Sequence, residues 1–105
     1  MAIEQFDVFH NPLRGGRDQR PYVITIQHLF LRDLPTCVIV PLVVPEALHI
    51  QPRLNPALDV NGRKLHLSPT EPFALSTRLL SKPIANLAAD RDRIVAALDM
   101  VFTGI

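Results

Sequence analysis

The spacing of proline is the feature that most constrains what this chain can form. Ten prolines and three of the four glycines lie within the first 83 residues, where they interrupt any long helix. Neither residue type occurs between Pro83 and Gly104. The sequence therefore predicts a body of short strands over about residues 3–80, followed by one helix over about residues 87–103.

The body contains four stretches with strand-like patterns. Gln5–His10 and Phe73–Leu79 alternate between two faces, and Tyr22–Gln27 and Thr36–Val44 are rich in β-branched and aromatic residues. By contrast, Asn11–Arg20 combines proline, two glycines and three arginines, which is typical of a surface loop. A phosphate-binding loop is the alternative for this stretch, but no helix start follows the glycines to present backbone amides.

The best-defined local structure is a hairpin over Leu58–Leu67. Asn61 and Gly62 suit a two-residue type I′ turn, which needs a positive φ at both positions. This turn places Asp59 opposite Lys64 on one face and pairs leucines on the other. Charge and apolar pairs therefore agree with one register.

The segment after Pro83 has the period of an amphipathic helix. Asp90 and Asp92 suit its first turn, and Gly104 is well placed to end it. The apolar residues expected to face the core are Leu87, Ile94, Leu98 and Val101, with Phe102 beside them. Antiparallel strands followed by one helix give a mostly β fold, as one domain over residues 1–105.

Composition limits the partners. Hydrophobic residues make up 48% of the chain and charged residues 20%, which excludes a disordered tail. A net charge of +1 gives no global field for nucleic acid or an anionic membrane. The longest uncharged stretch, Leu34–Pro45, is too short to cross a bilayer, and the first residues lack a signal-peptide pattern. We expect a cytoplasmic protein without direct contact to nucleic acid or membrane.

Catalytic and metal-binding patterns are not found in the sequence. The four histidines are widely spaced, and the single cysteine, Cys37, lies in an apolar run typical of a buried thiol. There is no G-x-S-x-G sequence and no glycine-rich phosphate loop. We expect no metal and no cofactor, and the residues favour a binding protein over an enzyme. Scattered polar residues that converge in space remain an alternative.

Three short motifs resemble the CcdB family of bacterial toxins. They are Gln5-Phe6-Asp7-Val8, Ile39-Val40-Pro41-Leu42 and Met100-Val101-Phe102-Thr103-Gly104-Ile105, and with chain length they extend the resemblance over nearly the whole sequence. The resemblance implies an SH3-like antiparallel sheet, or partly open barrel, with a last helix. It also implies a homodimer that binds the A subunit of DNA gyrase and traps the enzyme on cleaved DNA. A cognate antitoxin would wrap the dimer and keep it off gyrase.

The same resemblance implies a gyrase-binding end of the chain. The family ends in Trp-Gly-Ile, and here Gly104 and Ile105 match while Thr103 takes the tryptophan position. The chain contains no tryptophan at all. An exposed tryptophan is a typical interface anchor, so its loss puts the strength of gyrase binding in doubt. The simpler alternative is a frayed, solvent-facing chain end.

Other positions implied to contact gyrase are Asp92 and Asp99 on the helix, and Phe30 in the apolar loop Leu29–Leu31. The aspartates are alternatively only solvated surface charges. The loop is alternatively a continuation of the preceding strand into the core.

Three functional hypotheses follow. The first is a type II toxin that poisons gyrase or topoisomerase IV. The second is a CcdB-like module that binds its antitoxin, as a co-repressor, and has lost gyrase together with the tryptophan. The third is a small enzyme of unrecognised type on the same fold.

Overall fold

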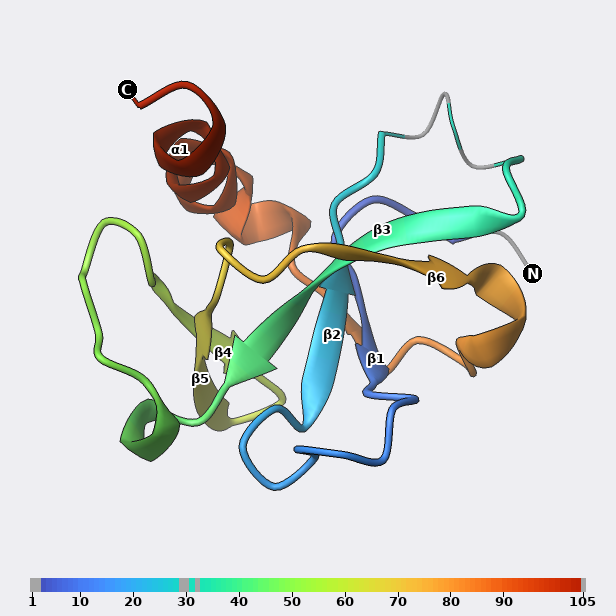
Figure 1. Cartoon of the computed structure of the whole chain (residues 1–105), viewed down its shortest axis with the longest axis horizontal. Helices are drawn as coiled ribbons and strands as arrows, with labels where there is room; N and C mark the ends of the chain where they lie inside the picture. Colours follow the sequence, from blue (N-terminus) through green and yellow to red (C-terminus); the bar gives the residue numbers. More distant parts are fainter. Residues whose placement is uncertain (1–2, 29–30, 32, 105) are drawn as a thin grey trace.

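The computed structural model describes residues 3–28, 31 and 33–104. Within these residues the chain forms one antiparallel sheet and one α-helix, α1 (Arg91–Phe102) (Figure 1). The strands are β1 (Asp7–His10), β2 (Tyr22–Thr25), β3 (Thr36–Val43), β4 (Ala57–Val60), β5 (Arg63–Leu67), β6 (Phe73–Ser76) and β7 (Ala85–Asn86).

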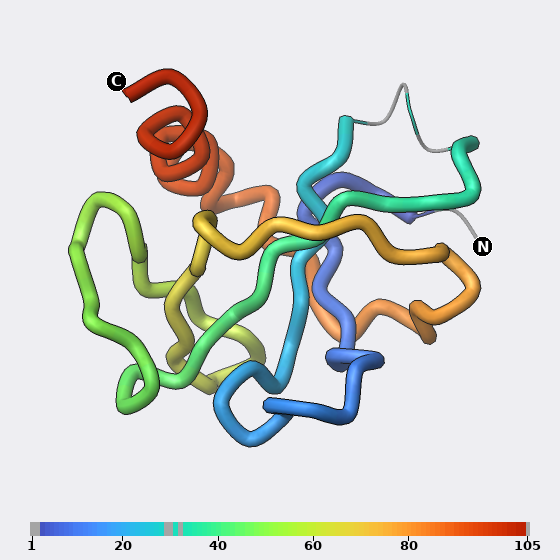
Figure 2. Tube along the Cα trace, in the orientation of Figure 1, coloured from blue at the N-terminus to red at the C-terminus, as the bar shows by residue number. Residues whose placement is uncertain are grey.

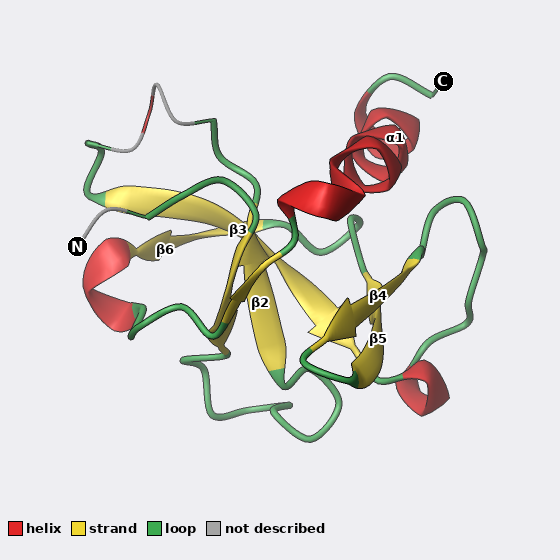
Figure 3. Cartoon of the chain, turned by 180° about the vertical axis from the view of Figure 1, so that it is seen from behind, coloured by secondary structure: helices red, strands yellow, loops and turns green. Residues whose placement is uncertain are grey.

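The sheet coils into a nearly closed barrel, in which β3 pairs with β2 along one edge and is long enough to pair with both β5 and β6 along the other. The strand order is β4-β5-β3-β2-β1-β7, and β6 pairs with β3 as well. The first half of β3 pairs with β6, and its last residues pair with β5 (Figure 3). This arrangement confirms the mostly β, SH3-like sheet with a last helix.

Two apolar clusters hold the fold because successive residues of the central strands face opposite ways. Val8, Ile24 and Val40 lie in one cluster, while their neighbours Phe9, Val23 and Ile39 lie in the other. The first cluster also receives Ile94 and Ala97, which are fully buried residues of α1. The helix is therefore seated on the barrel by one apolar stripe.

The predicted hairpin is confirmed. Asp59 pairs with Lys64 in the β4–β5 register, and Asn61 and Gly62 have φ values of 52° and 90°. The Gly62 amide donates a 2.7 Å hydrogen bond to Oδ1 of Asp59, which braces the turn.

Strand ends differ from the prediction where the backbone turns. β1 begins at Asp7, because Phe6 has a φ of 70° and its amide bonds to the Thr25 carbonyl (2.7 Å). β6 ends at Ser76, whose hydroxyl accepts from the Arg78 amide (3.4 Å) and starts the 3₁₀ turn Thr77–Leu79.

The short strand β7 was not predicted. It pairs with β1, and Nδ2 of Asn86 also donates a hydrogen bond to the buried Asp7 carboxylate (2.9 Å). A contact of this kind joins residues far apart in the chain, and no local pattern indicates it.

The helix begins later than predicted, because Ala88–Asp90 form a 3₁₀ turn before α1. The Asp90 side chain does not cap the helix and instead binds Arg93 at 2.6 Å. Gly104 ends the helix as predicted, with a φ of 76°. Placing Phe102 beside the core was wrong, because its side chain is 65% exposed.

Cys37 is the buried thiol that the sequence predicts. It is 5% exposed, and burial raises the pKa of its thiol, as expected for a structural cysteine. In the described ranges, no helix is both long and apolar enough to span a membrane.

Candidate functional site

One flank of α1 carries two of the predicted contact residues. Asp92 and Asp99 are seven residues apart, about two helical turns, so they lie on one side of the helix. Both are exposed, and the Asp92 side chain is 99% accessible. Asp92 is 3.6 Å from the Arg91 guanidinium, while the Asp99 carboxylate has no partner among the described residues. Two carboxylates are thus presented to solvent.

At the end of the helix, Thr103 and Gly104 lie next to Asp99. The Asp99 carbonyl accepts from the Thr103 amide (2.8 Å), the Thr103 hydroxyl (2.8 Å) and the Gly104 amide (3.0 Å). Because the Thr103 hydroxyl donates within the helix, its methyl group and an acceptor lone pair remain for a partner. Thr103 is therefore hydrogen-bonded to the last turn of the helix and exposed to solvent.

Phe102 is the functional candidate that sequence reasoning missed. It is the most exposed of the large hydrophobic residues described, and it adjoins Thr103. It follows Ile94 by eight residues, which rotates it about 80° away from the buried stripe at 100° per residue. Its exposure could have been predicted from this rotation and from its position in the last turn of the helix. Asp92, Asp99, Phe102 and Thr103 are called the acidic flank below.

Two predicted site residues, Phe30 and Ile105, lie outside the described residues. In the loop that contains Phe30, Leu31 is 48% exposed and its amide bonds to the His28 carbonyl (2.9 Å). For Leu31, the alternative of a strand running into the core is therefore wrong. The described residues between β2 and β3 lie at the same upper end of the molecule as α1 (Figures 1 and 3).

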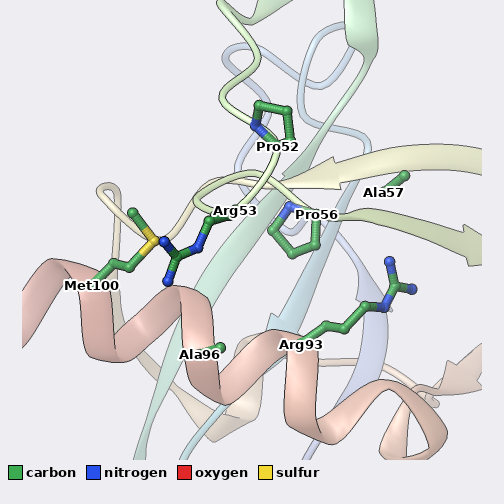
Figure 4. Close-up of a pocket in the computed structure, with 7 residues that line it drawn as sticks. All are labelled: Pro52, Arg53, Pro56, Ala57, Arg93, Ala96 and Met100. Atoms are coloured by element: carbon green, nitrogen blue, oxygen red, sulfur yellow. The ribbon is translucent and has the colours of Figure 1, made fainter. Parts of the chain in front are cut away.

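The neighbouring flank of α1 borders a groove. The long connection from β3 to β4 arches back toward the helix (Figure 2). Between them lies a hollow of about 290 Å³. Its lining, called the groove below, consists of Pro52, Arg53, Pro56, Ala57, Arg93, Ala96 and Met100 (Figure 4).

The groove combines an apolar floor with positive charge. In Figure 4 the Arg53 side chain lies beside Met100, and Arg93 extends from the helix toward β4. Arg93 is neutralised by Asp90, whereas Arg53 has no acidic partner among the described residues. The groove is therefore net positive, while the acidic flank is negative.

These features define a small barrel whose last helix presents two chemically different surfaces to solvent. Among the described residues, no cluster of histidine, cysteine and acidic side chains could hold a metal ion. The family model described as CcdB protein matches residues 5–104, and the chain belongs to the CcdB family of toxin–antitoxin toxins. No curated protein matches the sequence.

Proposed function

We propose that this protein is the toxin of a type II toxin–antitoxin system and that it poisons DNA gyrase by binding the A subunit. The whole chain acts as one toxin domain, assembles as a homodimer in the cytoplasm and is neutralised by a cognate antitoxin. Membership of the CcdB family supports this proposal. The observation that carries it is the exposed acidic flank at the end of α1.

The acidic flank offers a replacement for the missing tryptophan. Phe102 is 65% exposed next to Thr103, so an aromatic ring is available one residue from the tryptophan position. Aromatic rings make large, rigid contacts and stack on arginine. Asp92 and Asp99 can pair with arginines of the same partner. We therefore assign gyrase binding to Asp92, Asp99, Phe102, Thr103 and Gly104, with Ile105 and Phe30 as further contacts.

This mechanism requires no catalysis by the toxin. Gyrase cleaves and rejoins DNA itself, so a bound protein need only stabilise the cleaved state. The toxin's near-neutral net charge of +1 suits this role, because gyrase holds the DNA.

The second candidate function is an antitoxin-binding co-repressor that has lost gyrase. The threonine at position 103 favours this function, because a threonine buries far less surface in an interface than a tryptophan and would bind gyrase more weakly. Loss of an anchor residue commonly costs at least about 2 kcal/mol, or about 30-fold in affinity.

A plasmid cleavage assay with purified gyrase, ATP and this protein tests the proposal. We expect linear DNA after detergent and protease treatment, and we expect none when residues 103–105 are deleted. The deletion variant should still bind the antitoxin, which shows that it is folded. Normal supercoiling without linear DNA at high toxin excess would overturn the gyrase assignment.

Two further measurements separate the alternatives. Linear DNA with topoisomerase IV, but not with gyrase, would move the target to that enzyme. Antitoxin binding without inhibition of either enzyme would favour the co-repressor. The mass in solution tests the homodimer, and a monomer at micromolar concentration would contradict it.

A further inference from the structure

The strand β4 forms one edge of the sheet, and its main chain is half unpaired. Within the described residues β4 pairs only with β5. The Leu67 amide donates to the Pro56 carbonyl at 3.2 Å, and this bond determines which residues of β4 are hydrogen-bonded to β5. In an antiparallel pair the bonded positions alternate, so Leu58 and Val60 face β5. The amides and carbonyls of Ala57 and Asp59 therefore point away from the sheet.

The unpaired edge opens onto the space beside α1. A hollow of about 310 Å³ is lined by β4, Lys64, Asp90 and Arg93. It shares Ala57 and Arg93 with the groove, so the two hollows adjoin each other beside the helix. A segment lying against β4 would place side chains over the apolar floor made by Pro56, Ala96 and Met100 (Figure 4).

The charges along this path favour an acidic occupant. The path has three cationic side chains, those of Arg53, Lys64 and Arg93, against two carboxylates, those of Asp59 and Asp90. Both carboxylates are engaged, one by the Gly62 amide and one by Arg93. Arg53 and Lys64 have no ion-pair partner within the described part of the chain, which leaves positive charge at both ends of the path.

We propose that the free edge of β4 and the groove bind an extended segment of a partner polypeptide that carries carboxylates next to apolar side chains. The segment adds a short strand to β4 through the main chains of Ala57 and Asp59. An apolar side chain enters the groove near Met100, and a carboxylate pairs with Arg53. The inference rests on the proposed function in that the antitoxin is the polypeptide expected to supply this segment.

A second copy of this chain is a poorer occupant. Pairing β4 with β4 of another copy would bring two net positive paths together, and like charges in contact oppose association. An acidic segment instead gains both main-chain hydrogen bonds and charge pairing, the combination used when extended peptides add to a sheet edge.

Amide hydrogen exchange measured by NMR tests the main-chain contact directly. The probe is the product of the gene adjacent to the toxin gene, added to the full-length protein. We expect slower exchange at the amides of Ala57 and Asp59. The amides of Leu58 and Val60, which already face β5, should change little. Uniform protection along β4, or none, would overturn strand addition.

Substitution by proline gives a matched pair of variants. Ala57→Pro removes an amide that faces away from β5, at the first residue of a strand, where proline is tolerated. Ala74→Pro makes the same change on β6: the Thr77 amide bonds to the Pro35 carbonyl (3.0 Å), so the ladder phase turns the Ala74 amide away from β3. Equal melting temperatures of the two variants would show that both fold.

We expect Ala57→Pro to weaken binding of the adjacent gene product about tenfold, the effect of about one lost hydrogen bond. Ala74→Pro should leave affinity within about twofold, because a different edge is altered. Arg53→Glu should weaken binding by at least about tenfold and make it less sensitive to salt.

The outcomes separate this inference from the proposed function. If wild-type protein binds the adjacent gene product and Ala57→Pro binds equally well, strand addition at β4 is overturned while the toxin assignment stands. If wild-type protein does not bind that product, both are overturned. Self-association of wild-type protein that Ala57→Pro abolishes would assign β4 to a second copy and also overturn the inference.

Discussion

The two flanks of α1 are built in different ways. The acidic flank comes entirely from residues within and just after the helix, so helical spacing alone brings Asp92, Asp99 and Thr103 together. The groove on the other flank requires Pro52–Ala57, which lie more than thirty residues earlier in the chain. A surface made by local geometry survives whenever the helix forms, whereas the groove exists only in the folded barrel.

The flanks also differ in charge. Two exposed carboxylates lie on one flank, of which Asp92 is 3.6 Å from Arg91 and Asp99 has no partner among the described residues, and the unpaired Arg53 lies on the other. Opposite charges select different partners, since complementary potentials set specificity more than they set affinity. One short helix can therefore present two differently charged surfaces to different proteins, and the two surfaces meet at Ala96, which is one helical turn from Asp92 and from Asp99.

The largest predicted effect removes the support that both flanks share. Ile94 is fully buried and seats α1 on the barrel. Ile94→Ala should lower the free energy of unfolding by about 2–5 kcal/mol, because it leaves a cavity at a packed site. The measurement is chemical denaturation followed by circular dichroism.

The neighbouring variant Val95→Ala is the control, since Val95 is only half-buried. Val95→Ala should lower the free energy of unfolding by well under half as much as Ile94→Ala does. If the two variants lose equal stability, Ile94 does not seat the helix. Both flanks would then owe their positions to other contacts.

The contrast between the flanks explains what the sequence could predict. The β4–β5 register follows from Asn61 and Gly62, and the end of the helix follows from Gly104, because these signals are local. The turn at Phe6 and the strand β7 depend on bonds to Thr25 and Asp7, and no periodicity indicates such bonds.

The same division holds for the candidate site. Asp92 and Asp99 were placed together because helical spacing is regular. The apolar character of Phe102 predicts a place beside the core, but the last turn of the helix extends beyond the buried stripe and leaves its side chain exposed. The groove and the free edge of β4 need the positions of three separate segments, which only the fold provides.

A second prediction sharpens the assignment of the acidic flank. Phe102→Ala should weaken binding to gyrase by at least about 2 kcal/mol, or about 30-fold, if Phe102 is the aromatic anchor. Stability should change little because the ring is already exposed. Binding of the adjacent gene product through the groove should be unaffected, because the groove lies on the other flank. Isothermal titration calorimetry with the gyrase A subunit measures the effect.

Leu79→Ala is the matched control, because Leu79 is 52% exposed and lies in the 3₁₀ turn after β6. It should not change gyrase binding. Thr103→Trp provides the converse test and should strengthen binding, since it adds an aromatic side chain beside Phe102. Equal affinities for Phe102→Ala and wild type would remove Phe102 from the interface.

The smallest predicted effect concerns a contact away from both flanks. Glu71, in the turn before β6, binds Arg20 at 2.7 Å and accepts a 2.6 Å hydrogen bond from the Ser68 hydroxyl. Burial raises the pKa of Glu71, but the hydrogen bonds from Arg20 and Ser68 and the Arg20 charge outweigh it, so its pKa is lowered overall.

A lowered carboxylate pKa stabilises the folded state above the ordinary pKa of glutamate, and this contribution is lost as the pH falls through the lowered value. Glu71→Gln should therefore destabilise the protein at pH 7 by no more than about 1 kcal/mol, because both side chains are about one-third exposed. The difference from wild type should shrink as the pH drops below the folded-state pKa, as measured by urea denaturation across pH. Gyrase and antitoxin affinities should not change at neutral pH. A change in either one would show that the barrel end carrying Glu71 communicates with α1, and that the two flanks are not independent of the rest of the fold.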